Sequence, residues 1–168
     1  MPLFGKKDKA GNLCFNLAVA DGIPTFVAGD SIRVTFFDQE KKIEFKSRVF
    51  KNKEPIYVRY SQLICWNTLT EKEIIEKQKS VLGRAAIGGL FLGSLGSIIG
   101  GVSGVGTKQE TNDRSYVVIN YKSSQDTNEI KALSLEIVGA TMHLGAFLDK
   151  LIDLMPRQKE ELPKDGYL

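Results

Sequence analysis

Alternation of apolar and polar residues is the main pattern along the chain. From Ser31 to Phe37 apolar side chains recur at every second position, and the alternation returns from Lys42 to Lys46 after a polar turn. A period of two places these side chains on one face of a strand, so the two runs predict a β-hairpin with one buried face. Five other runs have strand character: Leu13–Val19, Ile56–Tyr60, Gln62–Trp66, Ser115–Tyr121 and Ile130–Val138.

A helical period replaces this alternation near the C-terminus. Apolar residues recur there at spacings of three and four, at Leu144, Phe147, Leu148, Leu151, Ile152 and Met155. This spacing predicts one amphipathic helix over about residues 140–155, which Pro156 ends. Earlier in the chain Thr70 and Glu73 fit a capping box, and the residues after them fit either a short helix or a strand.

The order of these elements predicts a mainly β fold of the α+β class. We expect a small antiparallel barrel or curled sheet whose open mouth is covered by the C-terminal helix. A chain of 168 residues suits one domain that carries an insertion and tails. The expected boundaries are a basic flexible arm over 1–11, the domain over 12–156 with an insertion at 83–107, and a charged tail over 157–168.

Composition and charge narrow the possible functions. Hydrophobic residues make up 42% and charged residues 26%, which excludes wholesale disorder. Two cysteines and one histidine provide neither a disulfide scaffold nor a usual zinc-ligand cluster. A net charge of +3 is too small to indicate nucleic-acid binding. Because the first residues lack the apolar core of a signal peptide and Pro2 excludes N-myristoylation, we expect a cytoplasmic protein.

One segment is uncharged and rich in glycine. Residues 85–107 contain no charged side chain, and residues 83–107 hold nine of the sixteen glycines. In a helix, small residues at every fourth position leave one face without bulky side chains, which lets a second helix approach closely. Two such sets occur: Ala85, Gly89 and Gly93, followed by Gly96, Gly100 and Gly104. The spacing fits one long helix or two short ones, and we expect two short helices in a hairpin.

Three roles remain open for this glycine-rich segment: packing against its own domain, self-association, or reversible insertion into a membrane. Permanent spanning is disfavoured, because it would place the strands before and after the segment on opposite sides of a bilayer. Those strands have to meet to close one core. We expect self-association, since a buried hairpin could use alanine and leucine in place of so many glycines. The residues expected at this contact are Ala85, Gly89, Gly93, Gly96, Gly100 and Gly104.

Three parts of the sequence carry a family resemblance: the segment from Gly83 to Gly104, the strand Tyr116–Tyr121 and the opening Phe4–Lys7. Together they resemble a group of small, mostly uncharacterised proteins of Gram-positive bacteria and their phages. Those proteins resemble pleckstrin-homology-like (PH-like) domains with a glycine-rich insertion. Over residues 13–155 the resemblance implies a PH-like barrel with a capping helix. It implies no established activity and assigns no functional residues.

The sequence contains no recognisable catalytic or cofactor motif. Gly101–Gly106 has the glycine spacing of a phosphate-binding loop, but Thr107–Lys108 reverses the required order of lysine and hydroxyl residue. His143 has no nucleophile and orienting acid in a recognisable pattern. Cys14 and Cys65 lie in apolar runs and are expected to be buried, inert thiols. We therefore expect no enzyme activity, no cofactor and no metal site.

A basic stretch runs from Lys41 to Arg59 and carries a net charge of +5 over 19 residues. Such a stretch fits a solvated strand whose lysines protect the sheet edge. It also fits a binding site for an anionic surface, either lipid headgroups or an acidic protein, because each basic residue near an anionic membrane adds about 1 kcal/mol. The candidate residues for this site are Lys42, Lys46, Arg48, Lys51 and Lys53.

These observations support two hypotheses of different classes. The first is a non-enzymatic module that self-associates through the glycine-rich segment and acts as a peripheral membrane protein. Its expected partners are a second copy of itself and an anionic membrane or acidic protein, and no nucleic acid is expected. The alternative is an inhibitor, encoded by a phage or mobile element, that binds a host effector protein.

Overall fold

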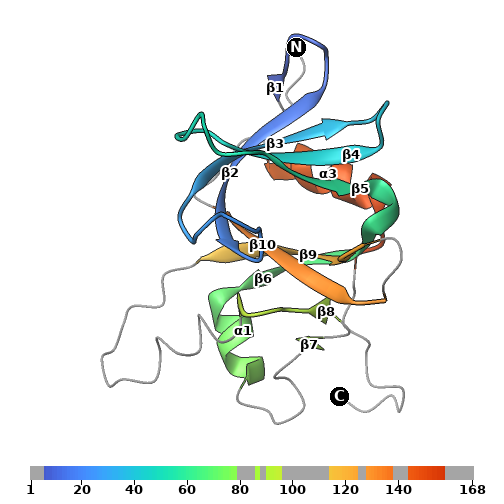
Figure 1. The fold of residues 1–168 in the computed structure, drawn as a ribbon. Helices are drawn as coiled ribbons and strands as arrows, with labels where there is room; N and C mark the ends of the chain where they lie inside the picture. The colour runs from blue at the N-terminus through green and yellow to red at the C-terminus, as the bar shows by residue number, and fades with distance from the viewer. Residues whose placement is uncertain are drawn as a thin grey trace.

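A computed structural model describes residues 6–78, 86–87, 90–95, 114–124, 128–137 and 144–157 (Figure 1). The main regular elements among these residues are antiparallel strands. The strands are β1 (Lys6–Lys7), β2 (Leu13–Asp21), β3 (Ser31–Phe37), β4 (Lys42–Ser47), β5 (Ile56–Arg59), β6 (Leu63–Thr70), β7 (Ala86–Ile87), β8 (Leu90–Phe91), β9 (Ser115–Lys122) and β10 (Ile130–Ile137). The helices are α1 (Glu71–Gln78), α3 (Leu144–Leu154) and the short 3₁₀ turn η1 (Tyr60–Gln62).

The main sheet is curled and open. Its strands follow the order β5-β4-β3-β2-β10-β9-β6, and β1 pairs with the start of β2. β2 joins the two halves, because Leu13 to Ala18 pair with β3 and the end of the strand pairs with β10. The sheet ends at β5 and β6, which do not pair with each other among the described residues. The predicted mainly β fold is confirmed as a curled sheet and not as a closed barrel.

Helix α3 fills the inside of the curl. Its residue Phe147 lies with its ring centroid 5.2 Å from that of Phe15 and 6.0 Å from that of Phe36. Phe147 and Leu151 are at most 1% exposed, and both belong to the inner core. The alternation expected in β3 is confirmed, since Ile32 belongs to the same core as Phe36. The amphipathic C-terminal helix is also confirmed over the residues described there.

A polar contact fastens α3 to the turn between β3 and β4. Lys150 donates hydrogen bonds to both carboxylate oxygens of Asp38, at 2.7 and 2.8 Å, and the Tyr60 hydroxyl donates to Asp38 Oδ1 at 2.7 Å. Burial alone would raise the pKa of Asp38, but these two donors outweigh it and lower that pKa below its ordinary value. The contact therefore stabilises the fold above the unfolded-state pKa of Asp38, and is lost as pH falls through the folded-state pKa.

The second half of the sheet is buried on both faces. Along β9 every residue from Tyr116 to Tyr121 is buried. Val117 and Ile119 face the inner core, whereas Tyr116 and Val118 join a second core on the outer face. Helix α1 and residues 90–95 cover this outer face, and Figure 1 shows them below β6, β9 and β10.

Helix α1 begins at the predicted capping box. The backbone N–H of Thr70 donates to Glu73 Oε2 at 2.7 Å, and the N–H of Glu73 donates to Thr70 Oγ1 at 3.2 Å. These reciprocal bonds satisfy two donors that a helix start would leave open. Of the two conformations that the sequence allowed after Thr70, the structure adopts the helix. Ile74 on this helix is fully buried in the outer core.

The prediction of a helical hairpin at 83–107 is wrong for the first residues that the structure describes there, which form strands. Ala86 and Ile87 form β7, which pairs antiparallel with β8, and Gly93 follows in a turn with φ +60°. Glycine disfavours a helix by about 1 kcal/mol per position, and Leu90 and Leu92 are instead buried against the sheet. The other residues of this segment, apart from 94 and 95, lie outside the described part of the chain.

Residues 6–11, which the sequence assigns to a basic arm, form a hairpin with the start of β2. Lys6 pairs with Cys14, and Lys7 pairs with Leu13. The Asp8 carboxylate fixes the turn by accepting the backbone N–H groups of Ala10 and Asn12 at 2.8 and 2.9 Å. This local bonding of an aspartate to the backbone two residues on is a common way to reverse the chain.

Gly22 provides a test of how closely β2 approaches β10. A Cβ atom built on Gly22 would lie 2.0 Å from the carbonyl oxygen of Ala132, and the residue has φ +81°. Backbone strain of about 1–2 kcal/mol and overpacking of about 1–3 kcal/mol should combine, so Gly22→Ala should lower the free energy of unfolding by about 2–5 kcal/mol. Urea denaturation measures this change.

Gly29 is the matched control, because it has φ +90° but no atom within 4 Å of its Cβ position. Gly29→Ala should therefore show the backbone strain alone, about 1–2 kcal/mol. Equal losses for the two variants would mean that the close approach of Gly22 to β10 is absent.

Candidate binding surface

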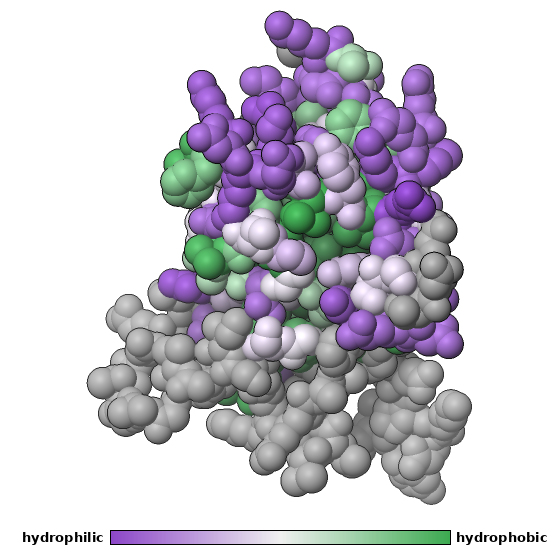
Figure 2. Space-filling model, viewed as in Figure 1, coloured by the Kyte–Doolittle hydropathy of each residue, from purple (hydrophilic) through white to green (hydrophobic). Residues whose placement is uncertain are grey.

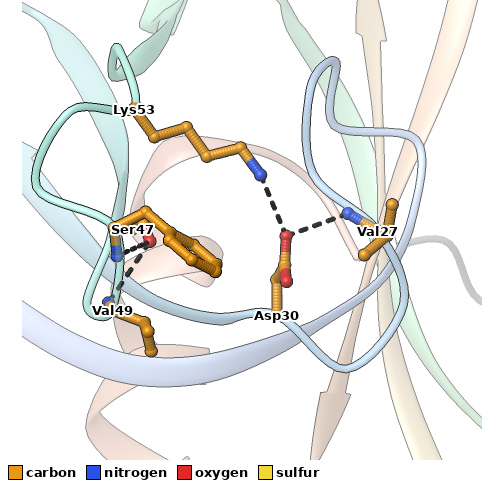
Figure 3. A network of polar contacts seen from close by, with 6 residues as sticks. Val27, Asp30, Ser47, Val49 and Lys53 are labelled. Atoms are coloured by element: carbon orange, nitrogen blue, oxygen red, sulfur yellow. Dashed lines mark hydrogen bonds and ion pairs between the residues drawn. The ribbon is translucent and has the colours of Figure 1, made fainter.

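Two loops meet at one end of the sheet, and an ion pair joins them. Residues 22–30 connect β2 to β3, and residues 48–55 connect β4 to β5. Lys53 Nζ lies 3.1 Å from Asp30 Oδ2, and the same oxygen accepts the backbone N–H of Val27 at 3.0 Å (Figure 3). The hydrogen bond from Val27, followed by that from Lys53, lowers the pKa of Asp30 below its ordinary value. One carboxylate thus fixes its own loop and holds the other.

Lys53 also packs between aromatic rings. Its Nζ atom lies 4.3 Å from the ring centroid of Phe26 and 5.9 Å from that of Phe50. A cation over an aromatic face is attracted by the ring quadrupole. Because Asp30 compensates its charge and these rings flank it, Lys53 acts mainly as a tether between the two loops. It is the predicted basic residue least suited to bind an external anion.

Ser47 sets the turn that follows β4. Its Oγ accepts the backbone N–H of Phe50 at 2.9 Å and that of Val49 at 3.3 Å (Figure 3). The turn leaves both side chains in solvent, where Val49 is 65% and Phe50 58% exposed. On the facing loop Val27 is 67% exposed. We call Val27, Val49 and Phe50 the apolar tip.

The apolar tip is unusual for the surface of this protein. Its members are three of the six large apolar side chains that are exposed among the described residues, and they come from two loops held together by one ion pair. Figure 2 shows apolar side chains at the left edge of the molecule, with hydrophilic side chains between and around them. Single exposed apolar residues need no explanation, whereas a group of them indicates a contact site.

The structure brings some of the predicted basic residues to this tip. Arg48 and Lys51 are exposed on the β4–β5 loop beside Val49 and Phe50. Arg48 also holds the base of the loop, since its Nη1 donates to Ser31 Oγ at 3.2 Å. The tip therefore combines apolar side chains with positive charge on one loop.

Lys42 and Lys46 lie instead on the outer face of β4. Lys42 is paired with Glu40, and its Nζ lies 4.8 Å from the ring centroid of Tyr57. The hydrogen bond to Glu40 raises the pKa of Lys42 above its ordinary value. Lys46 lies directly opposite Arg33 on β3, and both are exposed. Like charges in such a cross-strand pair are destabilising, so a bound anion would relieve the repulsion between Arg33 and Lys46.

The glycine-rich segment contributes to the fold where it is described. Leu90, Leu92 and Leu95 are at most 1% exposed and pack in the outer core. Ser94 Oγ donates to Asp21 Oδ2 at 2.5 Å, which fastens the turn at Gly93 to the end of β2. Of the residues predicted for self-association only Gly93 is described, and five lie outside the described residues: Ala85, Gly89, Gly96, Gly100 and Gly104.

The described part of the chain contains no cluster of metal-binding side chains. No group of three or more His, Cys, Asp or Glu residues there could hold a metal ion. Cys14 and Cys65 are free and buried, as expected, and burial raises the pKa of the Cys65 thiol. His143 lies outside the described residues. Among the described helices, none has the length and apolar character needed to cross a bilayer.

Comparison with protein families identifies the scaffold. Residues 24–143 match the family described as glycine zipper containing PH domain. Because this match covers more than half of the 168 residues, the chain belongs to that family. No curated protein and no solved structure matches the chain. The PH domain and the glycine zipper of the resemblance are thereby confirmed, whereas its origin in Gram-positive bacteria and their phages is not supported.

Sequence reasoning missed the apolar tip. Its residues lie in turn-forming stretches, where alternation gives no signal and apolar residues are usually assigned to neighbouring strands. The one available signal was the position of two apolar pairs, Phe26–Val27 and Val49–Phe50, within loops and close to Asp30 and Lys51. The pairing of Asp30 with Lys53, 23 residues apart, depends on the fold and has no local signature.

Proposed function

We propose that this protein is a non-enzymatic binding and assembly module that contacts anionic membranes reversibly and associates with copies of itself. The family supports a module of this kind, since it joins a PH domain to a glycine zipper. The observation that carries the membrane contact is the apolar tip with Arg48 and Lys51 beside it. Apolar side chains that protrude between cations match the interface of a bilayer, where headgroups are anionic and acyl chains lie beneath.

The size of the tip favours reversible contact. Full burial of a valine or phenylalanine side chain is worth about 1.5–3 kcal/mol, and each cation near an anionic surface adds about 1 kcal/mol. Three apolar side chains and a few cations then provide binding in the range of a peripheral protein. The ion pair between Lys53 and Asp30 supports this role by holding both loops in place before contact, which lowers the entropy lost on binding.

Self-association is proposed through the later part of the glycine-rich segment. Leu90, Leu92 and Leu95 are already used inside the domain. The second glycine set, at Gly96, Gly100 and Gly104, lies outside the described residues and retains the every-fourth spacing that favours close helix contact. The proposal therefore assigns the first part of the segment to the fold and the second part to assembly.

Membrane contact predicts that polar substitution of the tip weakens binding to vesicles of phosphatidylserine and phosphatidylcholine. The variant carrying Val49→Ser and Phe50→Ser should partition at least about tenfold more weakly, because the loss of even one buried side chain exceeds 1.4 kcal/mol. Reversing Lys46 and Lys51 to glutamate should also weaken binding, most strongly at low salt. Vesicle sedimentation over a range of salt concentrations measures both effects.

Ile152→Ser is the matched control, because Ile152 is 57% exposed but belongs to α3 and not to the tip. It should bind vesicles like the parent protein. If the tip variant also binds like the parent, insertion of the apolar tip is wrong. Loss of vesicle binding on charge reversal alone would then assign the contact to headgroup charge, and no binding of the parent protein to vesicles would refute membrane contact altogether.

Self-association predicts that Gly100→Leu shifts the protein to a smaller species without unfolding it. A leucine would overpack a backbone-to-backbone contact at a cost of about 1–3 kcal/mol. Size-exclusion chromatography with light scattering measures the mass, and thermal melting measures the stability. A lower melting temperature at unchanged mass would place the contact within one domain, and no change in either would contradict the glycine-zipper contact.

A further inference from the structure

The outer edge of β6 is occupied by the segment that follows helix α3. One edge of β6 pairs with β9, and on the other edge the backbone N–H of Trp66 donates to the carbonyl oxygen of Pro156 at 3.3 Å. Trp66 and Arg157 form a parallel β-bridge at this point. The chain thus leaves α3 and adds a short extended segment to the end of the sheet.

Three consecutive residues of β6 recognise the side chain of Arg157. Its guanidinium carbon lies 5.3 Å from the ring centroid of Trp66. Its Nε donates to Asn67 Oδ1 and its Nη2 donates to Thr68 Oγ1, both at 3.0 Å. An aromatic face together with two acceptors placed for a planar fork is selective for arginine over lysine. The sequence assigns residue 157 to a charged tail, and this contact has no signal in the local pattern.

Side chains occupy two further N–H groups of this edge. Backbone groups that point outward alternate along a strand, so the N–H groups of Thr68 and Thr70 share the outer edge with that of Trp66. Thr68 N–H donates to Asn67 Oδ1 at 2.8 Å, and Thr70 N–H donates to Glu73 Oε2. These two side-chain contacts occupy donors that an added strand would need beyond Trp66, which limits edge-to-edge pairing toward the end of β6.

The present occupant is held weakly enough to exchange. Its backbone hydrogen bond of 3.3 Å is longer than the usual 2.9–3.0 Å. Arg157 and Pro156 are both exposed, so their contacts are screened by solvent. Because the segment is tethered to α3, its high local concentration keeps the site filled despite these modest contacts.

We propose that the outer edge of β6 is a docking site for an extended peptide segment in which arginine follows proline, and that Pro156–Arg157 occupies it in cis. A partner carrying such a segment displaces the resident one: its backbone carbonyl accepts the Trp66 N–H, and its guanidinium takes the place over Trp66 between Asn67 and Thr68. This site shares no residue with the apolar tip, so it is independent of the proposed membrane contact.

The test uses the full chain, its single tryptophan and two synthetic peptides. Arg157→Ala should free the site and speed hydrogen exchange of the Trp66 amide at least about tenfold. The Asn67 amide, which faces β9 in the ladder, is the internal control and should not change. A peptide with the sequence of residues 153–159, Asp-Leu-Met-Pro-Arg-Gln-Lys, should restore slow exchange at Trp66 and shift its fluorescence in a saturable way.

The matched peptide carries alanine in place of arginine and should bind the Arg157→Ala variant at least about tenfold more weakly. The parent protein should bind the arginine peptide more weakly than the variant does, because its own segment competes. If Arg157→Ala disturbs folding, Arg157→Lys replaces it, since lysine keeps the charge but not the fork. Equal binding of the two peptides, no binding of either, or an unchanged Trp66 amide in the variant would each overturn the proposal.

Discussion

The two-sided burial of β9 is the constraint on which the rest of this structure depends. A strand that is apolar on both faces has to be covered twice, because exposed apolar area of that size would not remain in water. Helix α3 covers the inner face through Phe147 and Leu151, and α1 with residues 90–95 covers the outer face. The insertion is therefore part of the fold at its beginning, where Leu90 and Leu92 complete the second core.

The inner core fixes strands β2 to β5 and leaves the loops between them free to bind. The loops 22–30 and 48–55 leave strands that are fixed by the inner core, and the Lys53–Asp30 ion pair fixes them to each other. Rigid elements that support exposed loops are a common arrangement for binding sites. Here the arrangement presents Val27, Val49 and Phe50 to solvent. The loops are already ordered by the fold, so little further conformational entropy is lost on binding.

Much of the sheet could be predicted from the sequence, because apolar residues recur at every second position along its strands. Ile32 and Phe36 alternate with polar residues, and the structure buries both. The turn at Gly93 could not be predicted from the sequence. Glycines at every fourth position are also typical of a contact between two helices, and the local pattern does not show that the sheet buries Leu90 and Leu92. The hydrophobic pattern also could not predict long-range pairs such as Lys53 with Asp30, because neither loop contains a local signal for its partner.

Leu92 tests most directly whether the glycine-rich insertion begins as part of the domain. It is 1% exposed in the outer core, so Leu92→Ala should lower the free energy of unfolding by about 2–5 kcal/mol without changing the mass in solution. Ile130→Ala is the control on β10, where the side chain is 47% exposed, and should change the stability by less than about 0.5 kcal/mol. Urea denaturation with light scattering gives both quantities. A stable Leu92→Ala protein with a smaller mass would contradict this account, because Leu92 would then belong to a contact between copies of the chain.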